Sequence, residues 1–151
     1  AGVVVGLGGV AAHVLCKLPR DAEGYMGRLR CVQEISAVTA ACMMVKTSVF
    51  KAVGGFDEEL KVAFNDIDLC MKVRKYGVKI VFTPYAELYH YESKSRGMED
   101  TPEKQLRFSR EVNCFRRKWE RELLKGDSYY NPNLTLNNTD CSLRKQEKNG
   151  D

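Results

Sequence analysis

The chain has 151 residues, enough for one domain with a hydrophobic core and too few for two comfortable ones. Hydrophobic residues make up 44% and charged residues 29%, close to the average of soluble proteins, which argues against a disordered or membrane-embedded chain. The net charge is +4, and the segment 102–125 alone carries eight basic and four acidic residues, which equals the whole excess.

Six cysteines are spread along the chain without a C-x-x-C pair, so their spacing does not predict a zinc or redox site. Most have apolar neighbours in the sequence, and we expect buried free thiols in a reducing cytoplasm. The six are Cys16, Cys31, Cys42, Cys70, Cys114 and Cys141.

The first half of the chain predicts a strand over residues 2–7, followed by a glycine-rich turn and an irregular stretch. The run 36–46 is almost continuously apolar with small residues at its centre, which predicts a strand buried on both faces. Thr47 is then expected to cap a short helix that a glycine pair ends.

The second half predicts a helix over 66–76 with Asn65 as its N-cap and a glycine at its end. Strands are expected over 78–83 and 86–90. A last helix is expected to begin after Thr101, with proline at its first position. Its docking face steps by four, three, four and four residues, through Phe108, Val112, Phe115, Trp119 and Leu123.

Strands that alternate with helices indicate an α/β architecture of packed layers. We expect a domain part over 1–125, and over 126–151 an irregular C-terminal extension with a mobile charged tail. Few strands are predicted for such a fold, and the chain begins in mid-strand, as an excised fragment would.

The glycine motif of the first turn has two interpretations. Gly6, Gly8 and Ala11 fit the G-x-G-x-x-[GA] pattern of dinucleotide-binding proteins. That fold also requires a helix of several turns and a second strand that ends in an acid, whereas Pro19 truncates any helix here. The sequence therefore favours a plain glycine turn.

The pair Asp66 and Asp68 opens the helix predicted over 66–76. Acidic residues in a first turn stabilise almost any helix through its dipole. A carboxylate at a helix start can also point into a cleft and act as a general base. Metal binding by the pair alone is disfavoured, because positions i and i+2 of a helix point to different faces.

A third candidate site is the segment 85–97, in which His90 ends a predicted strand. A lone histidine is more often structural than a ligand. Here, however, it precedes a loop with hydroxyl and basic side chains, among them Ser93 and Arg96, which can hold phosphate oxygens beside a metal.

Taken together, residues 38–97 resemble the C-terminal, acceptor-side half of a family 2 glycosyltransferase with the GT-A fold, of the bacterial polysaccharide and rhamnosyltransferase kind. The matching motifs are V-G-G-F-D-E at 53–58 and F-N-D-I-D-L-C at 64–70, in the family's order. The segment 129–136, YYNPNLTL, also resembles segments that follow this module. The resemblance implies a partial GT-A fold, a small mixed sheet flanked by helices.

The resemblance also implies roles for single residues. Asp66 is the base on the acceptor hydroxyl, and Asp68 is either a supporting acid or a residue that starts the helix. Asn65 stands where glutamate is common, which puts the role of a second acid in doubt. His90 falls on the family's histidine at the donor's metal and diphosphate, with Arg96 and Ser93 as neighbours.

As a whole, the resemblance implies inverting transfer of a sugar from a nucleotide-diphosphate donor to a glycan or lipid-linked acceptor, with Mn or Mg. The Asp-x-Asp of the donor half is expected before this chain, so the fragment alone is expected to be inactive. The parent is expected in the cytoplasm, at or near the inner face of the membrane.

Rival interpretations start from the basic last helix and from the fold itself. The charges of 102–125 can form a solvated helix side, contact an anionic membrane surface or bind nucleic acid, the last being the least favoured. A non-catalytic protein that kept the fold is a further alternative.

Overall fold

The computed structural model describes residues 2–90 and 100–145. The described ranges form two separate two-stranded antiparallel sheets and four α-helices. The predicted α/β class is confirmed in that the described chain combines helices with small sheets. The small mixed sheet expected from the resemblance is wrong for these residues, because both pairings are antiparallel. β1 (Val3–Val5) pairs with β2 (Ala11–His13), and β3 (Gln33–Ile35) pairs with β4 (Ile80–Phe82). The GT-A fold stays a proposal.

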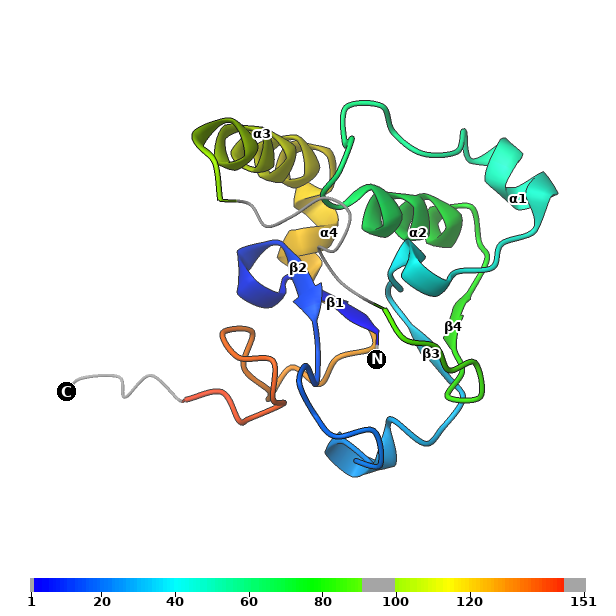
Figure 1. The fold of residues 1–151 in the computed structure, drawn as a ribbon, viewed down its shortest axis with the longest axis vertical. Coiled ribbons are helices and arrows are strands. Elements are labelled where there is room, and N and C mark those ends of the chain that lie inside the picture. The colour runs from blue at the N-terminus through cyan, green and yellow to red at the C-terminus, as the bar shows by residue number, and fades with distance from the viewer. Residues whose placement is uncertain (1, 91–99, 146–151) are drawn as a thin grey trace.

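The glycine motif forms the turn of the β1–β2 hairpin (Figure 1). The chain leaves β1 through Gly6 at φ 93°, a backbone conformation that favours glycine, and returns after the short 3-10 turn Leu7–Gly9. An antiparallel strand follows instead of a helix, so the plain-turn interpretation is confirmed.

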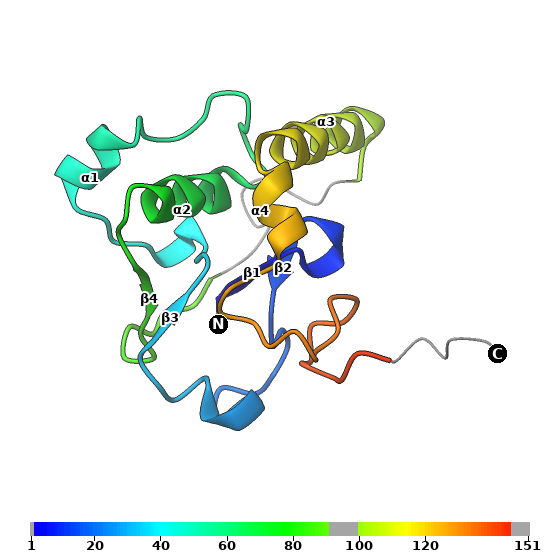
Figure 2. The same cartoon turned by 180° about the vertical axis from the view of Figure 1, so that it is seen from behind.

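β1 is buried on both faces, which explains its unbroken valine run. Val3 and Val5 point into a core beneath the helices, which we call the helix-side core. Val4 points into a second core against the chain after residue 126, which we call the extension-side core. Figure 1 and Figure 2 show β1 between α2, α3 and α4 on one side and this later chain on the other.

The helix-side core is built by three helices that pack over β1. They are α2 (Asn65–Lys75), α3 (Pro102–Lys118) and α4 (Glu120–Lys125). The docking face predicted for α3 is confirmed at its centre, because Phe115 and Trp119 are buried, whereas Phe108 is 40% exposed. The buried members of this core are Val3, Val5, Val10, Ala37, Leu60, Ile67, Cys70, Met71, Phe115 and Trp119.

The chain from 126 to 145 carries no helix or strand in its described part, yet it supplies much of the extension-side core. Tyr130 and Leu134 are buried there, and the Tyr130 hydroxyl donates to the carbonyl of Thr135. Apolar side chains in an irregular segment thus cover the second face of β1. The core consists of Val4, Leu7, Val14, Tyr130, Leu134 and Cys141.

Two predicted strands are wrong. The run 36–46 keeps only Ser36 and Ala37 buried, then forms a short 3-10 turn, Ala40–Cys42, and leaves Met44 99% exposed. Because the run bends into this turn, it does not continue along a sheet, and its later residues lack the burial that a central strand would give them. Residues 86–90 form no strand and are exposed.

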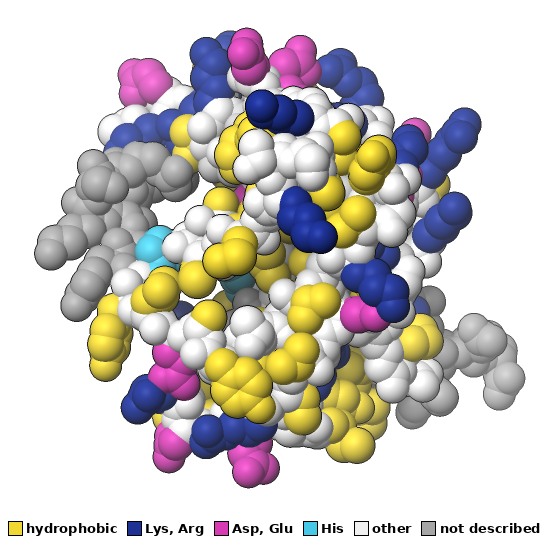
Figure 3. Space-filling view, turned by 90° about the vertical axis from the view of Figure 1, so that its right-hand side faces the viewer, with side chains coloured by type: hydrophobic (Ala, Val, Ile, Leu, Met, Phe, Trp, Pro, Cys, Tyr) yellow, Lys and Arg dark blue, Asp and Glu magenta, His cyan; other side chains and the backbone are white. Residues whose placement is uncertain are grey.

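Figure 3 looks onto the side of α1 (Thr47–Ala52) and β4, where hydrophobic side chains gather at the surface.

Helix starts differ from prediction by one residue at two places. Helix α2 begins at Asn65, after Phe64 in a left-handed conformation at φ 64°, so Asn65 is not the N-cap. Helix α1 begins at Thr47 itself. For α3 the prediction is confirmed, because the Thr101 hydroxyl accepts a hydrogen bond from the Lys104 amide at 3.4 Å.

All six cysteines are free thiols, as predicted, but the expected burial is wrong for half of them. Cys70 and Cys141 are buried and Cys114 is intermediate, whereas Cys16, Cys31 and Cys42 are exposed. No helix within the described ranges is both long and apolar enough to cross a bilayer.

Candidate active site

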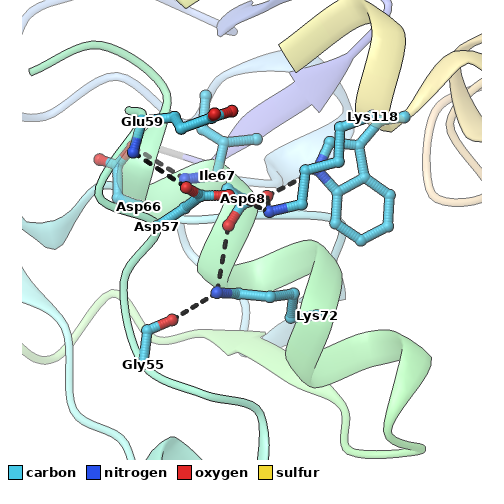
Figure 4. A network of polar contacts seen from close by, with 9 residues as sticks. Gly55, Asp57, Glu59, Asp66, Ile67, Asp68, Lys72 and Lys118 are labelled. Carbon is cyan, nitrogen blue, oxygen red and sulfur yellow. Dashed lines mark hydrogen bonds and ion pairs between the residues drawn. The ribbon is translucent and has the colours of Figure 1, made fainter. Parts of the chain in front are cut away.

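The candidate site lies at the first turn of α2, which carries Asn65, Asp66 and Asp68. Figure 4 shows Asp66 and Asp68 with their neighbours. Asp66 is half-buried. Its Oδ1 accepts the Ile67 amide at 2.8 Å, and its Oδ2 accepts the Ala40 amide at 3.0 Å. Each oxygen keeps lone-pair capacity for one more donor, and the carboxylate ties the 3-10 turn Ala40–Cys42 to the start of α2.

Asp68 has a different environment, because its side chain is fully buried. Its Oδ1 accepts from the indole Nε1 of Trp119 and from Lys118 Nζ, both at 2.8 Å. Lys72 Nζ, one turn along α2, lies 3.2 Å from Oδ2 without a well-formed hydrogen bond. A buried carboxylate held by two ammonium groups and an indole N–H is a structural anchor between α2 and the α3–α4 junction.

The V-G-G-F-D-E motif joins the same network. Lys118 Nζ also donates to Asp57 Oδ2, and Lys72 Nζ donates to the carbonyl of Gly55. Chiefly through the hydrogen bond from Lys118, the pKa of Asp57 is held below its ordinary value. Burial lowers the pKa of Lys118, but its bonds to the two aspartates outweigh that effect and raise it. The two lysines therefore fix the motif against the start of α2.

A second buried carboxylate, Glu111 of α3, holds the chain just before α2. Its two oxygens accept the amides of Val62 at 3.1 Å and Ala63 at 2.8 Å. Helix α3 thus holds the chain before α2 through Glu111, and it holds Asp57 and Asp68 through Lys118. The sequence analysis missed Glu111. The signal was its spacing, because it lies four residues before Phe115 and therefore on the buried face of the helix.

The donor-side candidates are not brought together with Asp66 by any described contact. His90 is exposed at the end of the first described range, and Ser93 and Arg96 lie outside the described residues. Within 2–90 and 100–145, no group of three or more His, Cys, Asp or Glu side chains could hold a metal ion.

Two cavities of the described chain also lie apart from Asp66. A small one, about 20 Å³, sits between β1 and the loop before β3. A larger one, about 230 Å³, lies at the opposite end of α2 and is lined by both basic and acidic residues, among them Arg74, Lys75, Glu122, Lys125 and Asp127. Asp66 therefore lines neither of these cavities.

Comparison with known proteins gives relatives of much greater length. An uncharacterised protein of Sinorhizobium fredii is 56% identical over 144 residues, which covers 95% of this chain and 16% of that protein. The O-antigen biosynthesis protein RfbC of Myxococcus xanthus is 37% identical over 152 residues, which covers all of this chain and 12% of that protein.

A third relative carries an enzyme's name. The N-acetylglucosaminyl-diphospho-decaprenol L-rhamnosyltransferase of Mycobacterium tuberculosis is 36% identical over 62 residues, 41% of this chain and 20% of the enzyme. The chain thus has relatives named for O-antigen biosynthesis and, over 62 residues, for rhamnosyl transfer. The names of these relatives support the resemblance to polysaccharide-synthesising transferases. No protein-family model and no solved structure matches the chain.

Proposed function

We propose that the chain is the acceptor-side part of a family 2 glycosyltransferase with a GT-A fold. The parent protein would transfer a sugar from a nucleotide-diphosphate donor to a hydroxyl of a glycan or lipid-linked acceptor, in the cytoplasm. The observation that carries the proposal is 37% identity, over the whole chain, to a protein named for O-antigen biosynthesis. The decaprenol in the name of the mycobacterial relative supports a lipid-linked acceptor.

In this proposal Asp66 is the general base. An acceptor hydroxyl donates to one carboxylate oxygen, passes its proton there and attacks the anomeric carbon of the donor sugar. The bond from that carbon to the diphosphate breaks, and the nucleotide diphosphate leaves with the electron pair. The amides of Ile67 and Ala40 hold the carboxylate in one orientation, which a base on a rigid element requires.

Asp68 supports the reaction through the fold rather than as a second base. Its oxygens face Lys118, Lys72 and Trp119, so a substrate hydroxyl does not reach it without displacing them. Asn65, at the first position of α2, is half-buried beside Asp66 and is proposed to contact the acceptor.

The donor side of the proposal rests on the resemblance alone. His90, Ser93 and Arg96 would lie near the diphosphate, and a divalent cation, Mn or Mg, belongs to the same expectation. The described residues do not offer a ligand set for that cation, so His90 would need partners from outside these ranges.

The proposal is tested by glycosyl transfer with the full-length gene product. Purified protein is incubated with a panel of nucleotide sugars and a polyprenyl-diphosphate sugar acceptor, with Mn or Mg and with a chelator. We expect transfer with at least one donor, and none from the 151-residue chain alone. Robust turnover by the short chain would contradict the assignment of the donor site to another part of the protein.

A further inference from the structure

The positive charge of the molecule gathers on α3 and α4. The segment 102–125 that forms them carries an excess equal to the net charge of the whole chain. Part of this charge is engaged within the fold, because Lys104, Arg107 and Lys118 form ion pairs with acidic residues. Arg110, Arg117 and Arg121 are exposed and have no acidic partner within residues 2–90 and 100–145.

Exposed leucines accompany these arginines. On α3, Leu106, Arg110 and Arg117 lie four and seven residues apart, on the side opposite the buried Phe115. Leu106 is 54% exposed. Beyond the bend at Trp119, the separate short helix α4 carries the exposed Arg121 and the 82% exposed Leu124. We call the five exposed residues Leu106, Arg110, Arg117, Arg121 and Leu124 the outer face of α3 and α4.

We propose that this outer face contacts the surface of an anionic lipid bilayer. Guanidinium groups pair with lipid phosphates and with the negative potential of the surface, while leucines enter the boundary between headgroups and acyl chains. Nucleic acid offers the phosphates but no place for the leucines, so the combination favours a membrane. The proposed contact uses exposed residues of α3 and α4 and does not depend on the role proposed for Asp66.

The test is co-sedimentation of the full-length protein with vesicles of phosphatidylcholine alone or with about 30% phosphatidylglycerol, over a series of salt concentrations. Binding is expected only to the anionic vesicles and is expected to fall as salt rises. The double variant Arg110→Gln/Arg117→Gln is expected to bind about 25-fold more weakly, roughly five-fold for each charge. The control Arg20→Gln/Arg30→Gln removes the same charge from the loop before β3 and is expected to bind as the parent does.

A second pair of measurements separates a membrane from nucleic acid. Leu106→Ser/Leu124→Ser is expected to weaken vesicle binding several-fold and to leave binding to a short DNA duplex unchanged. Equal losses in the arginine double variant and its control would overturn the proposal, because they indicate a general charge effect. Unchanged vesicle binding in the leucine variant, together with tight salt-dependent binding to the duplex, would overturn it in favour of nucleic acid.

Discussion

The indole Nε1 of Trp119 donates a 2.8 Å hydrogen bond to Asp68 Oδ1, and both side chains are buried. This bond joins the first turn of α2 to the junction of α3 and α4. Trp119→Phe keeps most of the ring in the core and removes only the donor. We expect a loss of about 2 kcal/mol in the free energy of unfolding, since the bond is buried and its acceptor is charged.

Urea unfolding followed by circular dichroism measures this loss, because Trp119 is the only tryptophan and the variant has no indole fluorescence. The exposed Tyr85→Phe is the control and is expected to leave the free energy of unfolding unchanged. Equal stability of Trp119→Phe and the parent would show that the bond makes no net contribution.

The two aspartates of α2 are expected to differ in their effect on stability. Asp68→Asn leaves Lys72 and Lys118 facing a neutral group in a buried place. We expect a loss of about 3 kcal/mol in the free energy of unfolding, which is the lower limit for breaking a buried ion pair, because both lysines are partly exposed. Asp66→Asn keeps an oxygen for one of its two amide donors and is expected to cost about 1 kcal/mol. The same urea titration compares them, and a reversed order would contradict the anchor role of Asp68.

The ion pair of Asp57 with Lys118 predicts the pH dependence of stability. The folded pKa of Asp57 lies below its ordinary value of 3.8, so its contribution is complete above that value and is lost as pH falls through the lowered pKa. The folded pKa of Lys118 lies above its ordinary 10.5, so its contribution is complete below 10.5 and is lost as pH rises through the raised pKa.

Thermal melts across pH, for the parent and for Asp57→Asn, measure this dependence. We expect the variant to lose less stability than the parent on acidification below pH 3.8. Glu58→Gln, which removes an exposed carboxylate from the adjacent position, is the control. Parallel acid limbs in the parent and Asp57→Asn would show that the pair does not stabilise the fold.

Glu111 is expected to protect two backbone amides. Glu111→Ala removes the acceptors of Val62 and Ala63 and leaves a small cavity beneath the chain before α2. We expect faster hydrogen exchange at these two amides, while the amides within α2 keep their protection. Exchange measured by NMR at single residues decides this, and unchanged rates at both positions would contradict the assigned contact.

The sequence predicts those elements whose signals are local. Helix α3 follows from its Thr101 cap and the spacing of its apolar face, and β1 follows from its run of valines. The strand expected over 36–46 fails, because the chain bends into the 3-10 turn Ala40–Cys42 and leaves Met44 at the surface.

The candidate site is predictable only in part, because some of its contacts join residues that are distant in the sequence. The start of α2 and its two aspartates can be read from the chain, but their different environments cannot. Asp68 is set apart by Trp119, which lies 51 positions away, and by Lys118 beside it. A contact over that distance follows from how α3 and α4 dock, which no local pattern encodes.

The most direct test of the proposed function is the rate of sugar transfer by full-length Asp66→Asn. The account predicts a rate lower by about 10² to 10⁴ with donor binding retained, because the base is lost and the fold is kept. Circular dichroism and a donor-binding titration on the same sample verify that the fold and the donor site are intact. A folded Asp66→Asn enzyme that transfers sugar at nearly the parent rate would contradict the assignment of Asp66 as the base.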